Sequence, residues 1–263
     1  MFMVKSLVLS DKIYNGFIKR NKDDISIRYL KYLNEMTQSF SNTKIKIKKL
    51  RQFDNRFEIL ISGPEEIFIF NMLKKKVGTI IDFDEIEIGK VYKGVMGDVG
   101  KVGFGIFVDC GILNPKVDVL LNLYDLRTQL CKARPMSITE VINAYDFIDQ
   151  FPVFVKITSI NKEKKQIQGK LDQQTLGLYE KLIDENLEAV FMSGDTKGQL
   201  KKAIVKSGHS RDVVSIDRYG FLENIVILQE NTTAPGIIAE IGKYLKNCNL
   251  SAIRPKRIKM LFL

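Results

Sequence analysis

The chain has 263 residues, 45% of them hydrophobic and 27% charged, and its mean hydropathy is −0.06. These values are typical of a globular protein with a sizeable core and argue against a disordered chain, and no apolar run approaches the roughly 18 residues of a membrane-spanning helix. Lysine and arginine number 41 against 31 acidic residues, a formal net charge of +10. This surplus favours association with polyanions, unless the lysines serve only as solvated surface.

Two further features of the sequence indicate the cellular compartment of the protein. The opening stretch "MFMVKSLVLSDK" has Lys5 inside its apolar run, unlike a signal peptide. The three cysteines, Cys110, Cys131 and Cys248, are odd in number and widely spaced, so they outline neither a disulfide framework nor a CxxC zinc knuckle. We therefore expect a cytoplasmic protein that does not associate with membranes.

The first eighty or so residues alternate strands with helices. The helix over 25–40 places Ile27, Leu30, Leu33 and Phe40 at helical spacing, and a second helix opens at Pro64. The strands expected around these helices cover 2–9, 43–50, 56–63 and 79–83. The resulting order, β-α-β-β-α-β, is that of the ferredoxin-like split βαβ unit.

The middle of the chain is rich in short strands and glycines. Strands are expected over 89–97, 102–111 and 117–123, with two more within 152–171. The helical segments of this region, "DLRTQL" and "SITEVINAYDFI", fall between the third and fourth strands. This pattern predicts a small five-stranded barrel with a helical insertion at 125–150.

The last ninety residues repeat the order of the first eighty. Strands are expected at 187–194, 211–220, 222–229 and 250–262, and helices at 195–208 and 232–248. We thus predict an α+β protein of three domains: a ferredoxin-like domain over 1–84, an OB-type barrel over 85–171 and a second ferredoxin-like domain over 172–263.

The decapeptide "VGFGIFVDCG" (102–111) carries Phe104 and Phe107 three residues apart, where strict alternation would place them on opposite faces. Gly103 and Gly105 permit a bend or bulge that resets the alternation. Both rings can then approach one outer surface and stack on unpaired bases. The alternative is that both rings belong to the barrel core.

Residues 89–171 resemble the RNA-binding OB-barrel module first described in ribosomal protein S-one. The matching pieces occur in order: "GKVYKGVMG", "GFGIFVDCG", "VDVLLNLYDL" and "VFVKITSINKEKKQI". The resemblance implies that the module's RNA-contacting aromatics fall on Phe104 and Phe107. Three positions depart from the module: its histidine falls on Asn122, the aspartate of its tail on Asn161 and its arginine on Gln166, with Lys164 and Lys165 just upstream.

The whole chain resembles an uncharacterised archaeal protein family that carries such a barrel between two ferredoxin-like domains. The phrases that carry this resemblance are "GFGIFVDCGI", "LYDLRTQL", "SGHSRDVVSIDRYGFLE" and "TTAPGIIAEIGKYL". The first 171 residues also resemble the larger stalk subunit of archaeal RNA polymerase, which has no third domain. Both resemblances imply a role in information processing.

Several clusters of basic residues could meet phosphate. In "TKIKIKKLR", Lys44, Lys46 and Lys48 share one face; they form either an RNA-facing strip or an edge strand protected against aggregation. Lys101 precedes the decapeptide. Further basic residues occur in the helix over 196–207 and in the C-terminal "RPKRIKM".

No catalytic motif emerges from the sequence. His209 in "SGHSRDVV" lacks a second base and a nucleophile motif, and no metal-ligand spacing appears. The segment around Thr232 to Gly236 resembles the helix opening of amino-acid-sensing ACT domains, which implies effector binding at that helix start.

We therefore expect a non-enzymatic RNA-binding protein without cofactor or metal, with rRNA or a ribosomal subunit as partner. Two alternatives remain open. The first is a protein–protein module bound to ribosomal proteins or RNA polymerase, and the second is a small-molecule sensor in the C-terminal domain. The oligomeric state is not indicated. The expected RNA-binding residues are Phe104, Phe107, Asn122, Lys164, Lys165, Lys101, Lys44, Lys46 and Lys48.

Overall fold

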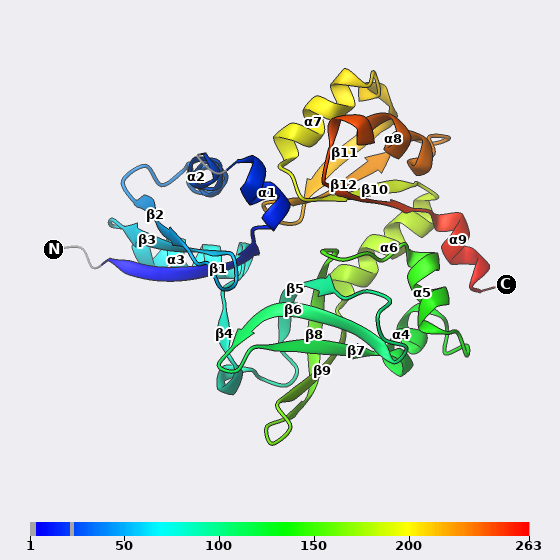
Figure 1. Cartoon of the computed structure of the whole chain (residues 1–263), viewed down its shortest axis with the longest axis horizontal. Helices are drawn as coiled ribbons and strands as arrows, with labels where there is room; N and C mark the ends of the chain where they lie inside the picture. Colours follow the sequence, from blue (N-terminus) through cyan, green and yellow to red (C-terminus); the bar gives the residue numbers. More distant parts are fainter. Residues whose placement is uncertain (1–3, 22–23, 263) are drawn as a thin grey trace. The chain divides into compact units, whose positions relative to one another are not determined.

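The computed structural model describes residues 4–21 and 24–262, and the chain forms two compact units, Met1–Ile81 and Asp82–Leu263 (Figure 1). Both units mix helices with sheets, and the second contains a closed five-stranded barrel. The predicted α+β class is therefore confirmed. Residues 2 and 3 of the first predicted strand lie outside the described residues.

The first unit is built on an antiparallel sheet in the order β1–β3–β2. Its strands alternate buried with more exposed side chains, as a sheet covered on one face requires. The elements are β1 (Lys5–Lys12), α1 (Asn15–Arg20), α2 (Ile25–Thr37), β2 (Lys44–Leu50), β3 (Arg56–Ser62) and α3 (Glu66–Lys76).

Two details of the first unit differ from the prediction. Helix α2 buries Ile25, Tyr29, Tyr32 and Leu33, whereas Ile27 is 68% exposed, so the apolar face is rotated from the one expected. The fourth strand is also displaced. Thr79 forms an isolated bridge with Leu9, but β4 (Ile81–Asp82) belongs to the sheet of the second unit and is followed directly by the 3-10 helix η1 (Phe83–Glu85).

The barrel of the second unit closes through five strand pairs. Strand β5 pairs with β6, β6 with β7, β7 with β9, β9 with β8, and β8 with β5. The β7–β9 pair is parallel and the others are antiparallel, which gives the strand order of an OB fold. The strands are β5 (Val91–Gly97), β6 (Gly105–Leu113), β7 (Val117–Asn122), β8 (Pro152–Asn161) and β9 (Gln166–Leu171).

The helical insertion lies between β7 and β8, as predicted. It consists of α4 (Leu123–Leu130) and α5 (Ile138–Tyr145). A capping box fixes the start of α5, where the Ser137 side chain accepts from the Glu140 N–H and the Glu140 carboxylate accepts from the Ser137 N–H. After β9 comes α6 (Gln173–Glu185), a helix that the sequence reasoning did not assign although Asp172 caps it.

The C-terminal part of the second unit is an antiparallel sheet in the order β11–β12–β10–β13. Numbered along this segment, the order is 2-3-1-4, the order of a split βαβ unit. The elements are β10 (Ala189–Ser193), α7 (Lys197–Lys206), η2 (Ser210–Asp212), β11 (Val213–Arg218), β12 (Glu223–Leu228), α8 (Ala234–Ile241), η3 (Gly242–Tyr244), β13 (Asn249–Ile253) and α9 (Pro255–Met260).

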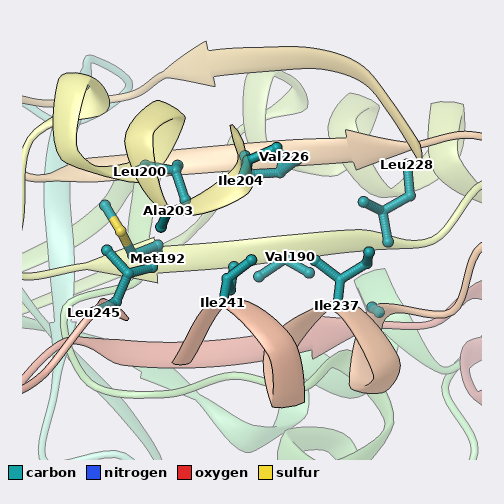
Figure 2. Close-up of a cluster of buried hydrophobic side chains, with 11 residues drawn as sticks. Val190, Met192, Leu200, Ala203, Ile204, Val226, Leu228, Ile237, Ile241 and Leu245 are labelled. Carbon is teal, nitrogen blue, oxygen red and sulfur yellow. The ribbon is translucent and has the colours of Figure 1, made fainter. Parts of the chain in front are cut away.

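Figure 2 shows the core between this sheet and its two helices. Val190 and Met192 of β10 meet Leu200 of α7 on one side and Ile237 and Ile241 of α8 on the other. All of them are buried. Because alternate residues of β10 point to this core, Phe191 and Ser193 project from the opposite face, toward the barrel.

An aromatic cluster joins the barrel to that opposite face. The ring centroid of Phe151, the residue just before β8, is 4.7 Å from that of Phe191 on β10. Tyr179 of α6 contacts Phe151, Tyr145 and Phe147, with ring centroids 5.1 to 6.1 Å apart. All five rings are buried, so barrel and C-terminal sheet share one core.

The predicted terminal strand over 250–262 is only partly correct. The strand ends at Ile253, and Pro255 begins α9. Proline suits the first turn of a helix, because it has no N–H to leave unpaired, and it holds Arg254 in an extended conformation. No helix within the described ranges is long and apolar enough to cross a membrane.

Candidate nucleic-acid interface

Phe104 and Phe107 lie together at the start of β6. Phe104, in the bend just before the strand, is 55% exposed, and Phe107 is half-buried. Their rings meet edge to face, with centroids 6.1 Å apart and planes at 90°. The Phe104 carbonyl accepts a 2.8 Å hydrogen bond from the Leu123 N–H, which fixes the bend against the end of β7.

Gly105 explains why the bend can form here. A Cβ on this residue would lie 2.3 Å from the Leu121 carbonyl oxygen, so β6 passes closer to β7 than any larger residue allows. Gly103 has open space around it. Thus Gly105 is needed for the close approach of the two strands, and the sequence pattern alone gave both glycines equal weight.

A row of outward side chains continues from Phe107 across the barrel. Phe107 lies opposite Leu120 of β7, and Leu120 lies opposite Gln168 of β9. Gln168 in turn lies opposite Ser159 of β8. Paired residues project from the same face of a sheet, so these four side chains form one strip. The alternate positions fill the barrel core: Ile106, Val108, Val119, Leu121 and Ile167.

The β8–β9 hairpin borders the far end of this strip. A hollow of about 600 Å³ there is lined by Ser159, Asn161, Gln168 and neighbouring residues. Lys164 and Lys165 are exposed at the hairpin tip, where the Asn161 side chain accepts a 2.8 Å hydrogen bond from the Lys164 N–H. The sequence reasoning named the two lysines but missed Gln168, which lies both on the strip and in the hollow.

Asn122 has a structural partner. Its Oδ1 accepts a 2.8 Å hydrogen bond from the Asp125 N–H, which makes it the N-cap of α4. Its Nδ2 donates to the Asp125 carboxylate at 2.6 Å and lies 3.5 Å from Gln168 Oε1. The cap holds the Asn122 amide at the edge of the strip, beside Gln168.

Lys101 lies in the exposed loop that leads to Phe104, and its Nζ pairs with the Asp98 carboxylate. This hydrogen bond raises the pKa of Lys101, so the ammonium stays charged. The local positive charge of the loop is nevertheless offset by Asp98.

The lysine row lies in the first unit. Lys44, Lys46 and Lys48 are exposed along β2, which is an edge strand, while Ile45 is buried. Lys48 donates to Glu58 at 2.6 Å, and this bond lowers the pKa of the Glu58 carboxyl. An edge position fits both of the roles considered for this row.

Other basic and polar groups have partners within the fold. The side chains of Arg254 and Arg257 bind Asp146, and Lys197 donates to the Ile216 carbonyl. His209 Nδ1 lies 2.6 Å from Asp212 Oδ2 beside a surface turn.

At the start of α8, the Ala234 N–H donates to Glu188 at 2.7 Å, so one of the free N–H groups proposed for an effector is already occupied. No group of three or more potential metal-ligating side chains occurs within the part of the chain that the structure describes.

Two family models match the second unit. Residues 86–181 match the DUF2110 central domain, and residues 187–253 match the DUF2110 C-terminal domain. The second unit therefore matches DUF2110 domains along most of its length. The aromatic pair, the strip and the hairpin hollow all lie within the segment matched to the DUF2110 central domain. No curated protein sequence matches the chain significantly.

Several solved structures show a partial likeness to this chain. The protein MJ1198 from Methanocaldococcus jannaschii is 23% identical over 34% of this chain and 95% of its own, with a TM-score of 0.23. GSP13 from Bacillus subtilis is 21% identical over 33% of this chain and 56% of its own, with a TM-score of 0.25. The intact alpha subunit of aIF2 from Pyrococcus abyssi is 10% identical over 64% of this chain and 97% of its own, with a TM-score of 0.26. At these scores the likeness carries no argument about function.

Proposed function

We propose that this protein binds single-stranded RNA through the outer face of its barrel, without catalysing a reaction, and that its target is rRNA or a ribosomal subunit. The exposed Phe104 ring, supported edge-on by Phe107, is the observation that supports this proposal most strongly. A solvent-exposed phenylalanine supported by a second ring offers a flat face on which an unpaired base can stack.

The surrounding side chains supply complementary chemistry. A base stacked on Phe104 gains about 1–3 kcal/mol. The amides of Gln168 and Asn161 can hydrogen-bond base edges of the next nucleotides, and Lys164 and Lys165 can neutralise phosphates beyond them. The strand would thus run from the aromatic pair along the strip to the hairpin.

The proposal is tested by a fluorescence anisotropy titration of the full chain with labelled single-stranded RNA at low salt. We expect Phe104→Ala to weaken binding at least tenfold without unfolding the protein. Phe68→Ala is the matched control, because Phe68 of α3 is 56% exposed and belongs to the other unit. Equal affinities of the wild type and Phe104→Ala would remove Phe104 from the mechanism.

The alternative function is that of a protein–protein module. The exposed Ile67 and Phe68 on α3 are the observation that favours it, since exposed apolar neighbours are typical of contact sites. Absence of RNA affinity at low salt would favour this alternative. Co-sedimentation of the full chain with ribosomal subunits, compared with RNA polymerase, would distinguish the partners.

A further inference from the structure

Tyr124, in the first turn of α4, is an exposed aromatic residue close to the aromatic pair. It is 76% exposed, compared with 55% for Phe104. The Leu123 N–H, which donates to the Phe104 carbonyl at 2.8 Å, belongs to the residue immediately before Tyr124. Because the backbone bonds between these atoms are about 1.2–1.5 Å long, the alpha carbons of Phe104 and Tyr124 lie within about 10 Å of each other. Neighbouring unpaired nucleotides of one strand can span such a separation.

Helix α4 holds Tyr124 in a fixed place. Near the other end of the helix, the Gln129 side chain donates to the Leu171 carbonyl at 2.7 Å and accepts from the Leu171 N–H at 3.0 Å, so the helix is bound to the end of β9. Leu126 and Leu130 are buried on its inner face. Tyr124 thus lies on the outer face of a helix that is fixed at both ends, and a ligand that contacts its ring needs to order little else.

The ring of Tyr124 has neither an aromatic nor a cationic partner within the described part of the chain, unlike the other exposed aromatic rings there. Phe53 and Tyr244 each have a cationic side chain over the ring, 4.2 Å and 5.5 Å from its centroid. Phe68 lies 5.0 Å from Phe40, and the fourth exposed ring belongs to the aromatic pair. The fold itself therefore makes no use of the Tyr124 ring, which is available to a ligand.

The acidic residue beside Tyr124 indicates which part of a nucleotide can bind there. Asp125 follows Tyr124, and its carboxylate accepts a 2.6 Å hydrogen bond from Asn122 Nδ2. An anionic group repels phosphate, whereas a base has an uncharged flat face that stacks on an aromatic ring. Tyr124 therefore favours a base over the sugar–phosphate backbone.

We infer, on the basis of the RNA-binding proposal, that Tyr124 stacks a second unpaired base. The base next to the one on Phe104 lies on Tyr124, so the bound strand extends from the aromatic pair onto the start of α4. The two rings belong to different elements, the bend before β6 and the first turn of α4, and each takes one base. In a duplex the bases are paired and stacked on one another, so they cannot reach either ring. The ligand is therefore RNA with at least two consecutive unpaired nucleotides.

The fluorescence of a single introduced tryptophan tests this inference, because stacking on a base quenches the fluorescence of an indole. The chain contains no tryptophan, so Tyr124→Trp and Phe104→Trp each report on one position. Tyr244→Trp, on η3 in the C-terminal part of the second unit, is the control. We expect single-stranded RNA to quench Tyr124→Trp and Phe104→Trp but not Tyr244→Trp, and duplex RNA to quench none of them.

The outcomes separate this inference from the RNA-binding proposal on which it rests. If single-stranded RNA quenches Phe104→Trp but not Tyr124→Trp, the inference is wrong and the RNA-binding proposal stands. Equal quenching of Tyr124→Trp by duplex RNA would also overturn the inference. If neither Phe104→Trp nor Tyr124→Trp is quenched, the RNA-binding proposal fails as well.

Anisotropy titrations of the full chain with single-stranded RNA measure what the ring contributes. Tyr124→Ala should lose at least about fivefold in affinity, and Tyr124→Phe, which keeps an aromatic ring, should restore most of this loss. Tyr244→Ala removes another exposed tyrosine and should bind RNA like the wild type. Equal affinities of the wild type and a folded Tyr124→Ala would contradict the inference.

Discussion

The edge of one phenylalanine ring meets the face of the other where Phe104 contacts Phe107, at a centroid distance of 6.1 Å. Such pairs contribute about 0.5–1.5 kcal/mol beyond the area they bury. We therefore expect the two rings to act together in RNA binding. The affinity lost in the double variant Phe104→Ala/Phe107→Ala should be smaller than the sum of the two single losses. A double-mutant cycle by anisotropy measures this coupling, and strictly additive losses would contradict it.

The hairpin lysines should determine part of the salt dependence. On single strands each phosphate contact contributes about 0.7 to the slope of log affinity against log salt concentration. Lys164→Ala/Lys165→Ala should therefore reduce the slope by about 1.4 if both side chains bind phosphate. Lys181→Ala, on the exposed side of α6, should leave the slope unchanged. An unaltered slope in the double variant would place the phosphates elsewhere.

Gly105 and Gly103 should respond differently to alanine. The Cβ of Gly105→Ala would collide with the Leu121 carbonyl, so we expect a loss of about 1–3 kcal/mol in the free energy of unfolding. Gly103→Ala meets open space and should change this free energy by less than about 1 kcal/mol. Urea denaturation followed by circular dichroism compares the two. If the two variants changed the free energy of unfolding equally, β6 could move away from β7 without loss of stability.

The shared aromatic core predicts that barrel and C-terminal sheet unfold together. Phe151→Ala removes a fully buried ring and should cost about 3–5 kcal/mol. Hydrogen exchange should then rise in β5 and β8 of the barrel and in β10 of the sheet. Phe57→Ala, which removes a buried ring stacked on Tyr29 in the first unit, should not affect these strands. Retained protection in β10 after Phe151→Ala would show that the two parts are independent.

The buried carboxyl of Asp146 should make the free energy of unfolding depend on pH. Burial raises the pKa of its carboxyl, although Arg254 and Arg257 oppose the shift. The native state then holds the proton to a higher pH than the unfolded state does. The contribution of this carboxyl to the free energy of unfolding is therefore complete at pH values below its pKa in the unfolded state. It is lost as the pH rises through its pKa in the folded state. Asp146→Asn does not titrate, so its free energy of unfolding relative to wild type should increase from acid to neutral pH. Urea denaturation at several pH values measures this, and a decrease would mean that the arginines outweigh burial.

Local patterns predicted most of the element order, because they depend on neighbours in the sequence. Alternating apolar residues marked β1 and β3, and glycine spacing marked the barrel strands. Two features depend on distant partners and were not predictable: the apolar face of α2 is set by the strands it covers, and β4 joins the barrel sheet. The Asn122 cap of α4 is local, since its partner Asp125 lies three residues away, and an asparagine just before a helix is a usual N-cap signal.

The candidate sites divide in the same way. The aromatic pair was predictable because both rings and the intervening Gly105 lie within four residues. The ion pairs of Arg254 and Arg257 with Asp146 could not be predicted, because Asp146 lies 108 and 111 residues away in the sequence. Gln168 carried no signal of its own; its place on the strip follows from the parallel pairing of β7 with β9.

The parallel β7–β9 pair also bears on synthesis. The nascent chain makes β7 before the two insertion helices, and β9 follows only after them and β8. Until residue 171 has left the ribosome, β7 has β6 on one side and an unpaired row of N–H and C=O groups on the other. An open strand edge is a template for pairing with other chains, so slow translation of the insertion would prolong the period in which this protein is most prone to aggregate.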